Sequence, residues 1–286
     1  MKHPRRLLIL SLLLLAAAAL AAQQPAEQQK PAPPPDPAAM AEQRQALMAI
    51  ESTLDRAQRA KLIEEFLQKY PDTPYAWSLC LHASDSFRRI NNHAKAVEYG
   101  ERAIALKADD PVAHMIVADS LAEGAKKEDA DYAEKLLKAE KYAQRSIELL
   151  PPYLSAITPP PTMTQEEVEL QKKLIEAQPH ATLGYVYLLR DNNQKAEEEL
   201  LKAVQLAEAQ PNQADLIRLG RAYLLQDKHE QAVEVFRKAV GLGGLMYEQA
   251  VEHLKLAEQE LAKRKPAAPT PPESQPPAPK PPQPEA

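Results

Sequence analysis

The side chains that could carry chemistry in this 286-residue chain are few and poorly spaced for catalysis. His229 and Glu230 begin a pattern typical of zinc-binding helices, but Val233 stands where the second histidine is needed. Cys80 is the only cysteine, so the chain can form neither an internal disulfide nor a Cys-based zinc site. It lies beside Leu81 on an apolar face, which favours buried packing over nucleophilic chemistry.

Other chemical signatures are missing from the sequence as well. It has no glycine-rich phosphate loop and no G-x-S-x-G motif, and carboxylate pairs such as Glu64–Glu65 lie on faces expected to be solvated. Acidic residues outnumber basic ones by 40 to 35, and the net charge of −5 argues against nucleic acid as a partner. We therefore expect no catalytic residue, cofactor or metal, and an enzyme ranks third among our functional hypotheses.

The N-terminus has the pattern of an export signal. Basic residues at positions 2, 5 and 6 precede an apolar run over 7–20, and Ala19 and Ala21 supply small residues for a cleavage site. The run is short for a membrane-spanning helix, which needs about 20 apolar residues. We predict a signal peptide at 1–21 and a periplasmic or secreted protein. The alternative is a retained anchor in the inner membrane, and only then would the membrane be a partner.

Proline is abundant, with 27 residues, whereas glycine occurs only 7 times. Much of the proline lies in two segments, 22–38 and 265–286, which otherwise contain mainly Ala and Gln with a few charged residues. Such segments bury too little apolar surface to offset the entropy of ordering, so we predict disordered linkers. The alternative is that they act as ligands for a proline-binding groove or as a cell-wall tether.

The region between the two segments, 39–264, is predicted to be helical throughout. Apolar residues recur at spacings of three and four, and alternation typical of strands never persists. Proline or Asn-Asn breaks, among them Pro151–Pro152 and Pro179, predict helices of about 12 to 20 residues. A Pro-rich break at 153–163 separates off a further helix over 165–177.

Two segments of this region match each other at an offset of 36 residues. The matched positions are Leu183, Gly184, Tyr187, Ala196, Leu200 and Ala203 in one segment and Leu219, Gly220, Tyr223, Ala232, Phe236 and Ala239 in the other. The pattern resembles the tetratricopeptide repeat, in which Gly and Ala allow two helices to cross closely while Tyr and Phe fill the space beside them. The early Trp of that family is replaced here by His180 and Leu216.

The resemblance implies an all-α fold, a right-handed α-solenoid of stacked helix hairpins, because a single hairpin cannot cover its own apolar face. We predict a degenerate entry hairpin at 39–70, repeats at about 77–108, 111–152, 177–210 and 213–244, and a capping helix at 246–264. The repeat motif also implies an insertion near 124–132, because Ala118 and Ala139 lie further apart than the motif expects.

The resemblance also implies a concave groove, lined by the first helix of each hairpin, that accepts a protein or peptide partner. The positions that would face this groove are Leu81, Asp85, Arg88, Arg89, Met115, Asp119, Ala181, Tyr185, Leu188, Ile217, Arg221 and Leu224. The Lys and Asn clamp that binds C-terminal carboxylates in some members of the family is absent from these positions. We expect a non-enzymatic scaffold or adaptor of the bacterial envelope; the alternative is a structural spacer or assembly factor attached through its Pro-rich segments.

Overall fold

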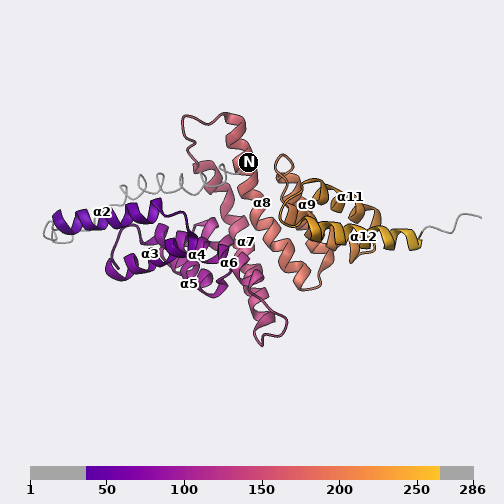
Figure 1. The fold of residues 1–286 in the computed structure, drawn as a ribbon, viewed down its shortest axis with the longest axis horizontal. Helices are drawn as coiled ribbons and strands as arrows, with labels where there is room; N and C mark the ends of the chain where they lie inside the picture. Colours follow the sequence, from indigo (N-terminus) through magenta and orange to yellow (C-terminus); the bar gives the residue numbers. More distant parts are fainter. Residues whose placement is uncertain (1–36, 265–286) are drawn as a thin grey trace, which may run out of the picture.

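The computed structural model describes residues 37–264, and this part of the chain contains eleven helices and no β-strand (Figure 1). The predicted signal peptide and C-terminal segment lie outside the described residues, as does most of the linker 22–38. Helix α2 begins at Pro37, two residues inside that predicted linker. The helices are α2 (Pro37–Ser52), α3 (Arg56–Lys69), α4 (Ala76–Arg89), α5 (His93–Leu106), α6 (Pro111–Glu123), α7 (Tyr132–Ala156), α8 (Gln165–Leu189), α9 (Asn193–Leu206), α10 (Gln213–Leu224), α11 (His229–Gly241) and α12 (Tyr247–Arg264).

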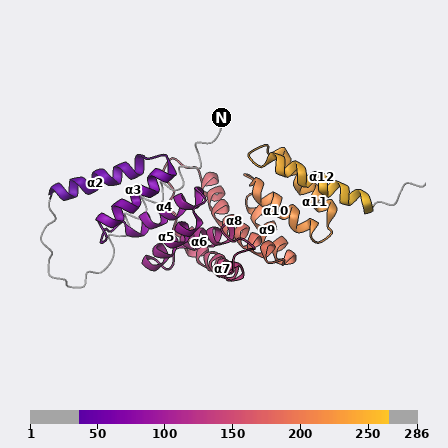
Figure 2. The same cartoon turned by 60° about the horizontal axis from the view of Figure 1, so that its bottom comes forward.

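The helices form a row in which each one packs against the next, with α2 at one end and α12 at the other (Figures 1 and 2). Alternate helices also touch along the row, because α4 contacts α6, α6 contacts α8, and α8 contacts α10. The chain is therefore an α-solenoid of stacked helix hairpins, and the predicted fold class is confirmed. The connection between α6 and α7, residues 124–131, coincides with the insertion expected from the sequence.

Three of the hairpins turn in the same way. Asn91, Asp191 and Asp227 adopt positive φ angles of 59°, 57° and 60° at the end of α4, α8 and α10. The backbone N–H of the following residue donates to a carbonyl five residues back, which closes the helix end. These bonds are Asn92 to Phe87, Asn192 to Tyr187 and Lys228 to Tyr223.

Polar side chains define where most helices begin. An Asp or Asn oxygen accepts a hydrogen bond from a backbone N–H of the first turn in α3, α5, α6, α9 and α10. Helix α8 begins with a full capping box, in which Thr164 and Glu167 each bind the backbone N–H of the other. Local sequence therefore fixes these helix starts before any tertiary packing.

Two predicted helix breaks are wrong. Helix α7 continues through Pro151 and Pro152, and α8 continues through Pro179, so each helix has 25 residues. The segment predicted as a separate helix over 165–177 is the first half of α8. A proline removes one backbone hydrogen bond from a helix but keeps a helical φ, and Pro179 is fully buried. Burial of Pro179 offsets its missing bond, whereas Pro151 and Pro152 are exposed near the C-terminal end of α7. The paired ends of the two helices stand out from the row (Figure 1).

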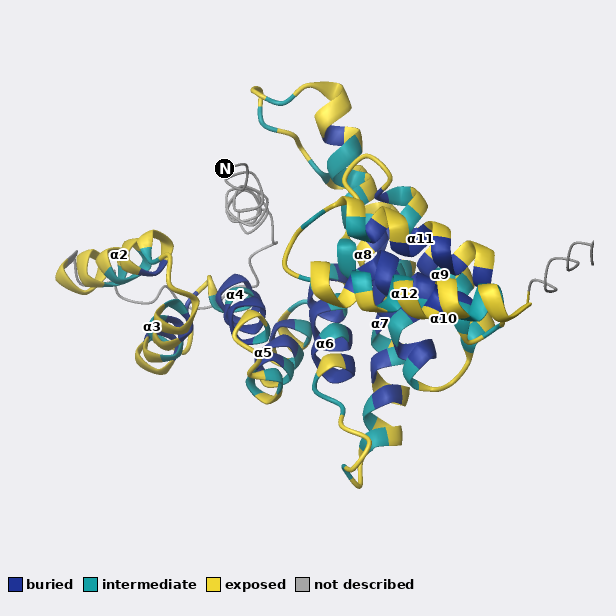
Figure 3. Cartoon of the chain, turned by 45° about the vertical axis from the view of Figure 1, so that its right-hand side comes forward, coloured by how far each residue is buried: buried dark blue, intermediate teal, exposed yellow. Residues whose placement is uncertain are grey.

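The core follows the hairpins and contains the repeat positions matched at an offset of 36 (Figure 3). A Cβ atom at Gly184 would lie 2.6 Å from Leu200, and one at Gly220 would lie 2.5 Å from the ring of Phe236. Contacts this short leave no room for a side chain, so both glycines mark a close crossing of two helices. Leu200, Ala203, Ala232 and Ala239 are buried near these crossings.

Candidate partner-binding face

The predicted groove residues come from four successive first helices, α4, α6, α8 and α10. We call the surface of these four helices the inner face. Three predicted groove residues do not lie open on it: Leu81, Leu188 and Ile217 are only 5%, 6% and 2% exposed and belong to the hydrophobic core. Ala181 is also buried. Their assignment as partner contacts is corrected, because neighbouring helices of the array already cover them.

The polar groove residues of α4 and α6 form one connected group. Asp85 accepts hydrogen bonds from Arg88 Nη2 at 3.1 Å and from Arg89 Nε at 2.7 Å. Arg88 Nη1 then reaches across to Asp119 of α6 at 2.8 Å. Two hairpins are therefore joined by a charged bridge whose central side chains are less than one-fifth exposed.

The same group extends onto α8 and α10. Thr182 Oγ1 donates to Asp119 at 3.4 Å, and Arg218 of α10 pairs with Asp215 at 3.4 Å and with Glu123 of α6 at 3.8 Å. The guanidinium of Arg218 also lies 4.1 Å from the centre of the Tyr185 ring, which is a close cation–π contact. We call the nine residues of this set the inner charged network: Asp85, Arg88, Arg89, Asp119, Glu123, Thr182, Tyr185, Asp215 and Arg218.

Sequence reasoning found five members of the network and missed Glu123, Thr182, Asp215 and Arg218. The signal for Glu123 was available, because it lies four residues after Asp119 and therefore on the same side of the helix. The other three lie within two residues of predicted groove positions. Their importance comes from contacts between hairpins, which a single helical pattern does not show.

Burial changes the acidity of the carboxyl groups in the network. It raises the pKa of Asp215 to about 6; Asp119 adds to the increase and Arg218 opposes it. Burial and the nearby charge of Asp119 also raise the pKa of Glu123. At Asp85 burial acts in the same direction, but Arg89 and Arg88 outweigh it and lower the pKa. The neighbouring Asp119 thus raises the pKa of both Glu123 and Asp215, while Arg218 acts to lower both.

Arg221 and Leu224 lie on α10 beside this network and are half-buried. Arg221 makes no ion pair with any of the residues that the structure describes, so its guanidinium is available to a partner. Met115 on α6 is half-buried as well and packs at the edge of the core. The inner face thus presents Arg, Tyr and Met side chains, which are types enriched at protein interfaces.

The described residues do not bring together the side chains of a metal or nucleophilic centre. Within residues 37–264 no group of three or more His, Cys, Asp or Glu side chains is arranged to hold a metal ion. Cys80 is 1% exposed and burial raises the pKa of its thiol, so this cysteine is not poised as a nucleophile. In the same part of the chain, no helix has the length and apolar character needed to cross a bilayer.

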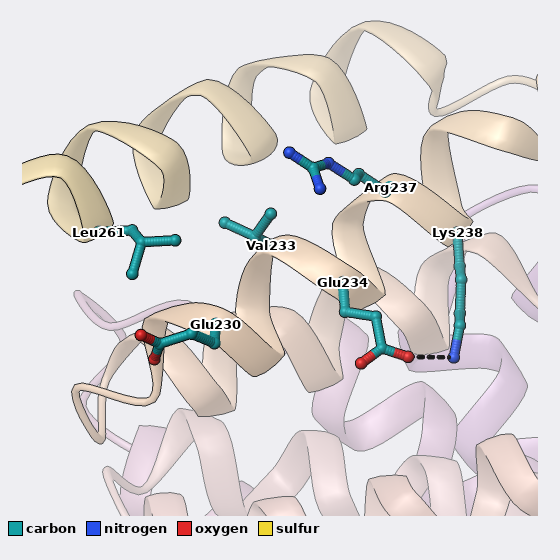
Figure 4. A pocket seen from close by; sticks show the side chains of 6 residues that line it. All are labelled: Glu230, Val233, Glu234, Arg237, Lys238 and Leu261. Atoms are coloured by element: carbon teal, nitrogen blue, oxygen red, sulfur yellow. Dashed lines mark ion pairs between the residues drawn. The ribbon is translucent and has the colours of Figure 1, made fainter.

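One open groove lies away from the inner face, at the C-terminal end of the array (Figure 4). Val233 of α11 and Leu261 of α12 face each other across it, and charged side chains stand at its edges. We call it the terminal groove; its lining residues are Glu230, Val233, Glu234, Arg237, Lys238 and Leu261.

A family model described as a tetratricopeptide repeat matches residues 216–242, which include most of α10 and all of α11. No curated protein sequence matches the chain. The family match and the stacked hairpins together support the resemblance of this sequence to the tetratricopeptide repeat.

Similar solved structures include TTC0263, a thermophilic tetratricopeptide repeat protein of Thermus thermophilus. It is 16% identical, with 78% of this chain and 98% of that chain covered and a TM-score of 0.49. A MamA protein is 17% identical, with 81% and 100% covered and a TM-score of 0.47. PilW, described as a widely conserved type IV pilus biogenesis factor, is 14% identical, with 82% and 96% covered and a TM-score of 0.48.

Proposed function

We propose that this protein is a non-enzymatic scaffold that binds a protein or peptide partner along its inner face. The observation that carries the proposal is the inner charged network, which joins four successive hairpins through contacts such as Arg88–Asp119 and Arg218–Glu123. A network of this kind holds the side chains in fixed positions, so a partner meets a surface that is already ordered. Arg221 and Tyr185 supply the kinds of side chain that dominate binding energy at interfaces.

The partner would lie across the first helices, from α4 to α10. Buried Leu81, Leu188 and Ile217 set the floor of this face, and the contacts would come from the partly exposed side chains above them. An extended peptide or a helix of a partner protein fits such a surface, because both present side chains at regular intervals.

We further propose that the protein works in the bacterial cell envelope after export. The support is the basic and apolar pattern of residues 2–21. Protease protection of the tagged protein in intact cells and in cells with a permeabilised outer membrane tests this proposal. Protection that persists after permeabilisation would place the protein in the cytoplasm and contradict it.

A quantitative pull-down with cross-linking tests the binding proposal. We expect Arg221→Glu to reduce recovery of the partner about tenfold or more, since reversing a charge at an interface centre costs several kcal/mol. Arg221 has no ion pair in the described part of the chain, so the melting temperature should stay within about 2 °C of the parent. Lys173→Glu is the matched control, because Lys173 is exposed on α8 away from the network. Equal partner recovery by both variants would reject the inner face as the binding surface.

A further inference from the structure

Hairpins α4–α5 and α8–α9 carry the same polar turn. At an offset of 100 residues, each has an Asn that caps its second helix and a lysine three residues further on. Lys95 Nζ lies 5.0 Å from the centre of the Phe87 ring. Lys195 Nζ lies 5.3 Å from the centre of the Tyr187 ring, which is the matching contact. The two lysines therefore have the same place and the same kind of aromatic neighbour.

Only the first of these two lysines has a counter-ion. Lys95 Nζ lies 2.6 Å from Oε1 of Glu64, which belongs to the preceding hairpin. The hairpin before α8–α9 also supplies a carboxylate, Glu140 of α7, but Glu140 pairs with Arg190. Arg190 stands where the first hairpin has an isoleucine. The arginine takes the carboxylate, and Lys195 makes no ion pair with any residue from 37 to 264.

A cavity of about 140 Å³ lies between these groups, where α7, α8 and α9 meet. We call it the hairpin cavity; its lining residues are Glu140, Tyr187, Arg190, Asn192 and Lys195. Two cations against one carboxylate leave it with one unmatched positive charge. The side chain of Arg190 is 38% exposed and Lys195 is exposed as well, so a ligand can reach both. None of the lining residues belongs to the inner charged network.

The chemistry of the hairpin cavity favours a ligand with one negative charge. Arg190 binds Glu140 through Nη1, so its remaining N–H groups can donate to a second acceptor. The cavity has the volume of roughly four to five water molecules at about 30 Å³ each, which accommodates a carboxylate group and the carbon beside it. Glu140 repels the second charge of a dianion such as phosphate, so a carboxylate suits the cavity better.

We propose that the hairpin cavity binds a carboxylate group, presented either by an acidic side chain of a partner protein or by a small carboxylic acid. Lys195 Nζ and the free N–H groups of Arg190 donate charge-assisted hydrogen bonds to its oxygens. The ring of Tyr187 and the bond to Glu140 hold the two cations in place. The site shares no residue with the inner face, so it is tested apart from it.

Titration of the full chain with sodium acetate, followed by amide NMR at a constant ionic strength of about 0.1 M, is the first test. We expect saturable shifts of the backbone amides at 192–195 with a Kd on the order of 10 mM or below. The matching amides at 92–95 should show none, because Glu64 already neutralises that lysine. Lys195→Gln should raise the Kd about tenfold or more, whereas Lys95→Gln, the matched control, should leave it unchanged.

Three outcomes of this titration overturn the proposal. They are an absence of saturable shifts at 192–195, equal shifts in the two turns, and a Lys195→Gln variant that binds acetate as the parent does.

The variant Arg190→Ile copies the first hairpin and gives a second test. Glu140 is then released to pair with Lys195, so acetate binding should fall about tenfold or more. Circular dichroism checks that the variant is folded. A folded Arg190→Ile variant with the parent's affinity contradicts the role of the unpaired charge.

Two short blocked peptides, one with a central Glu and one with Gln in its place, distinguish the sources of the carboxylate. A Glu peptide that binds more tightly than acetate assigns the site to an acidic side chain of a partner. A Glu peptide that binds no more tightly than acetate assigns it to a small carboxylic acid. A Gln peptide that binds as tightly as the Glu peptide overturns the carboxylate assignment.

Discussion

Asp215 is the residue of the inner face whose charge depends most on its surroundings. Its side chain is 12% exposed, it pairs with Arg218 at 3.4 Å, and burial raises its pKa from 3.8 to about 6. A carboxyl group whose pKa is higher in the folded state binds its proton more tightly there. Its contribution to stability is therefore full below about pH 4 and is lost as the pH rises through 6.

Replacing this carboxyl group should change how stability depends on pH. The variant Asp215→Asn stays neutral, so its free energy of unfolding relative to the parent should improve by on the order of 2 kcal/mol between pH 4 and pH 7.5. Urea denaturation at pH 4, 6 and 7.5 measures the difference. A difference that stays constant across these pH values would show that Asp215 titrates normally.

The two glycines at helix crossings, Gly184 and Gly220, lead to a prediction about packing. The variant Gly220→Leu should destabilise the protein by about 1–3 kcal/mol or more, because a Cβ atom already meets the Phe236 ring at 2.5 Å. Gly241→Ala is the control, since nothing lies within 4 Å of a Cβ atom at that position. Thermal denaturation compares the two variants. Equal melting temperatures for Gly220→Leu and the parent would refute the placement of Gly220 at a close crossing of two helices.

At the scale of the element, three of the hairpins depend on one strained residue in the turn. Asp191 has a φ of 57°, a conformation that glycine adopts freely and residues with a β-carbon adopt at a cost. The bond from the Asn192 N–H to the Tyr187 carbonyl holds it there. Asn91 and Asp227 occupy the same place in two other hairpins.

Relieving this strain should stabilise the hairpin. We expect Asp191→Gly to raise the free energy of unfolding by a few tenths to about 1 kcal/mol, while Asp191→Val should lower it by about 1–2 kcal/mol. Chemical denaturation of both variants at one pH gives the comparison. Similar stabilities for the Gly and Val variants would mean that the turn relaxes out of the left-handed conformation.

Helices α7 and α8 show where local rules fail at this scale. Prolines at 151, 152 and 179 predicted helix ends, yet each lies inside a 25-residue helix. At Pro179 the local cost of the missing hydrogen bond is offset by burial against neighbouring helices, whereas Pro151 and Pro152 are exposed in the last turns of α7. A sequence pattern within one helix therefore does not reveal which prolines are tolerated.

At the scale of the whole molecule, the array needs its last helix. Ala250 and Ala257 of α12 are fully buried in the same cluster as the repeat residues of α10 and α11. Solenoids depend on such terminal helices to cover the final apolar face. Helix α12 is thus part of the core as well as the end of the row.

Truncation tests whether α12 covers the apolar face of α11. Deleting residues 245–286 should lower the melting temperature by on the order of 5 °C or more and promote aggregation, because the α11 face is then exposed. Deleting only 265–286 is the matched control and should leave the melting temperature unchanged. Light scattering during thermal denaturation records both effects. Equal behaviour of the two truncations would show that α12 does not cap the array.

The inner face was predictable in part. The repeat phase placed Asp85, Arg88, Asp119 and Tyr185 on first helices, and the structure joins them in one network. The same phase placed Leu81, Leu188 and Ile217 on an open surface, but they are buried. The position of a residue within the repeat fixes the direction in which its side chain leaves the helix. The distance to the next hairpin decides whether that side chain stays exposed.

The sequence alone determined that residues 39–264 form helix hairpins, because apolar spacing, capping residues and small residues at crossings all act within about 40 residues. It also predicted the stacked array, since no hairpin can bury its own apolar face. Only the tertiary structure decided which prolines lie inside helices, which groove positions are buried, and that Arg218 bridges three helices. These outcomes depend on contacts between hairpins, where burial and long-range charge pairing outweigh the local preferences that a sequence pattern records.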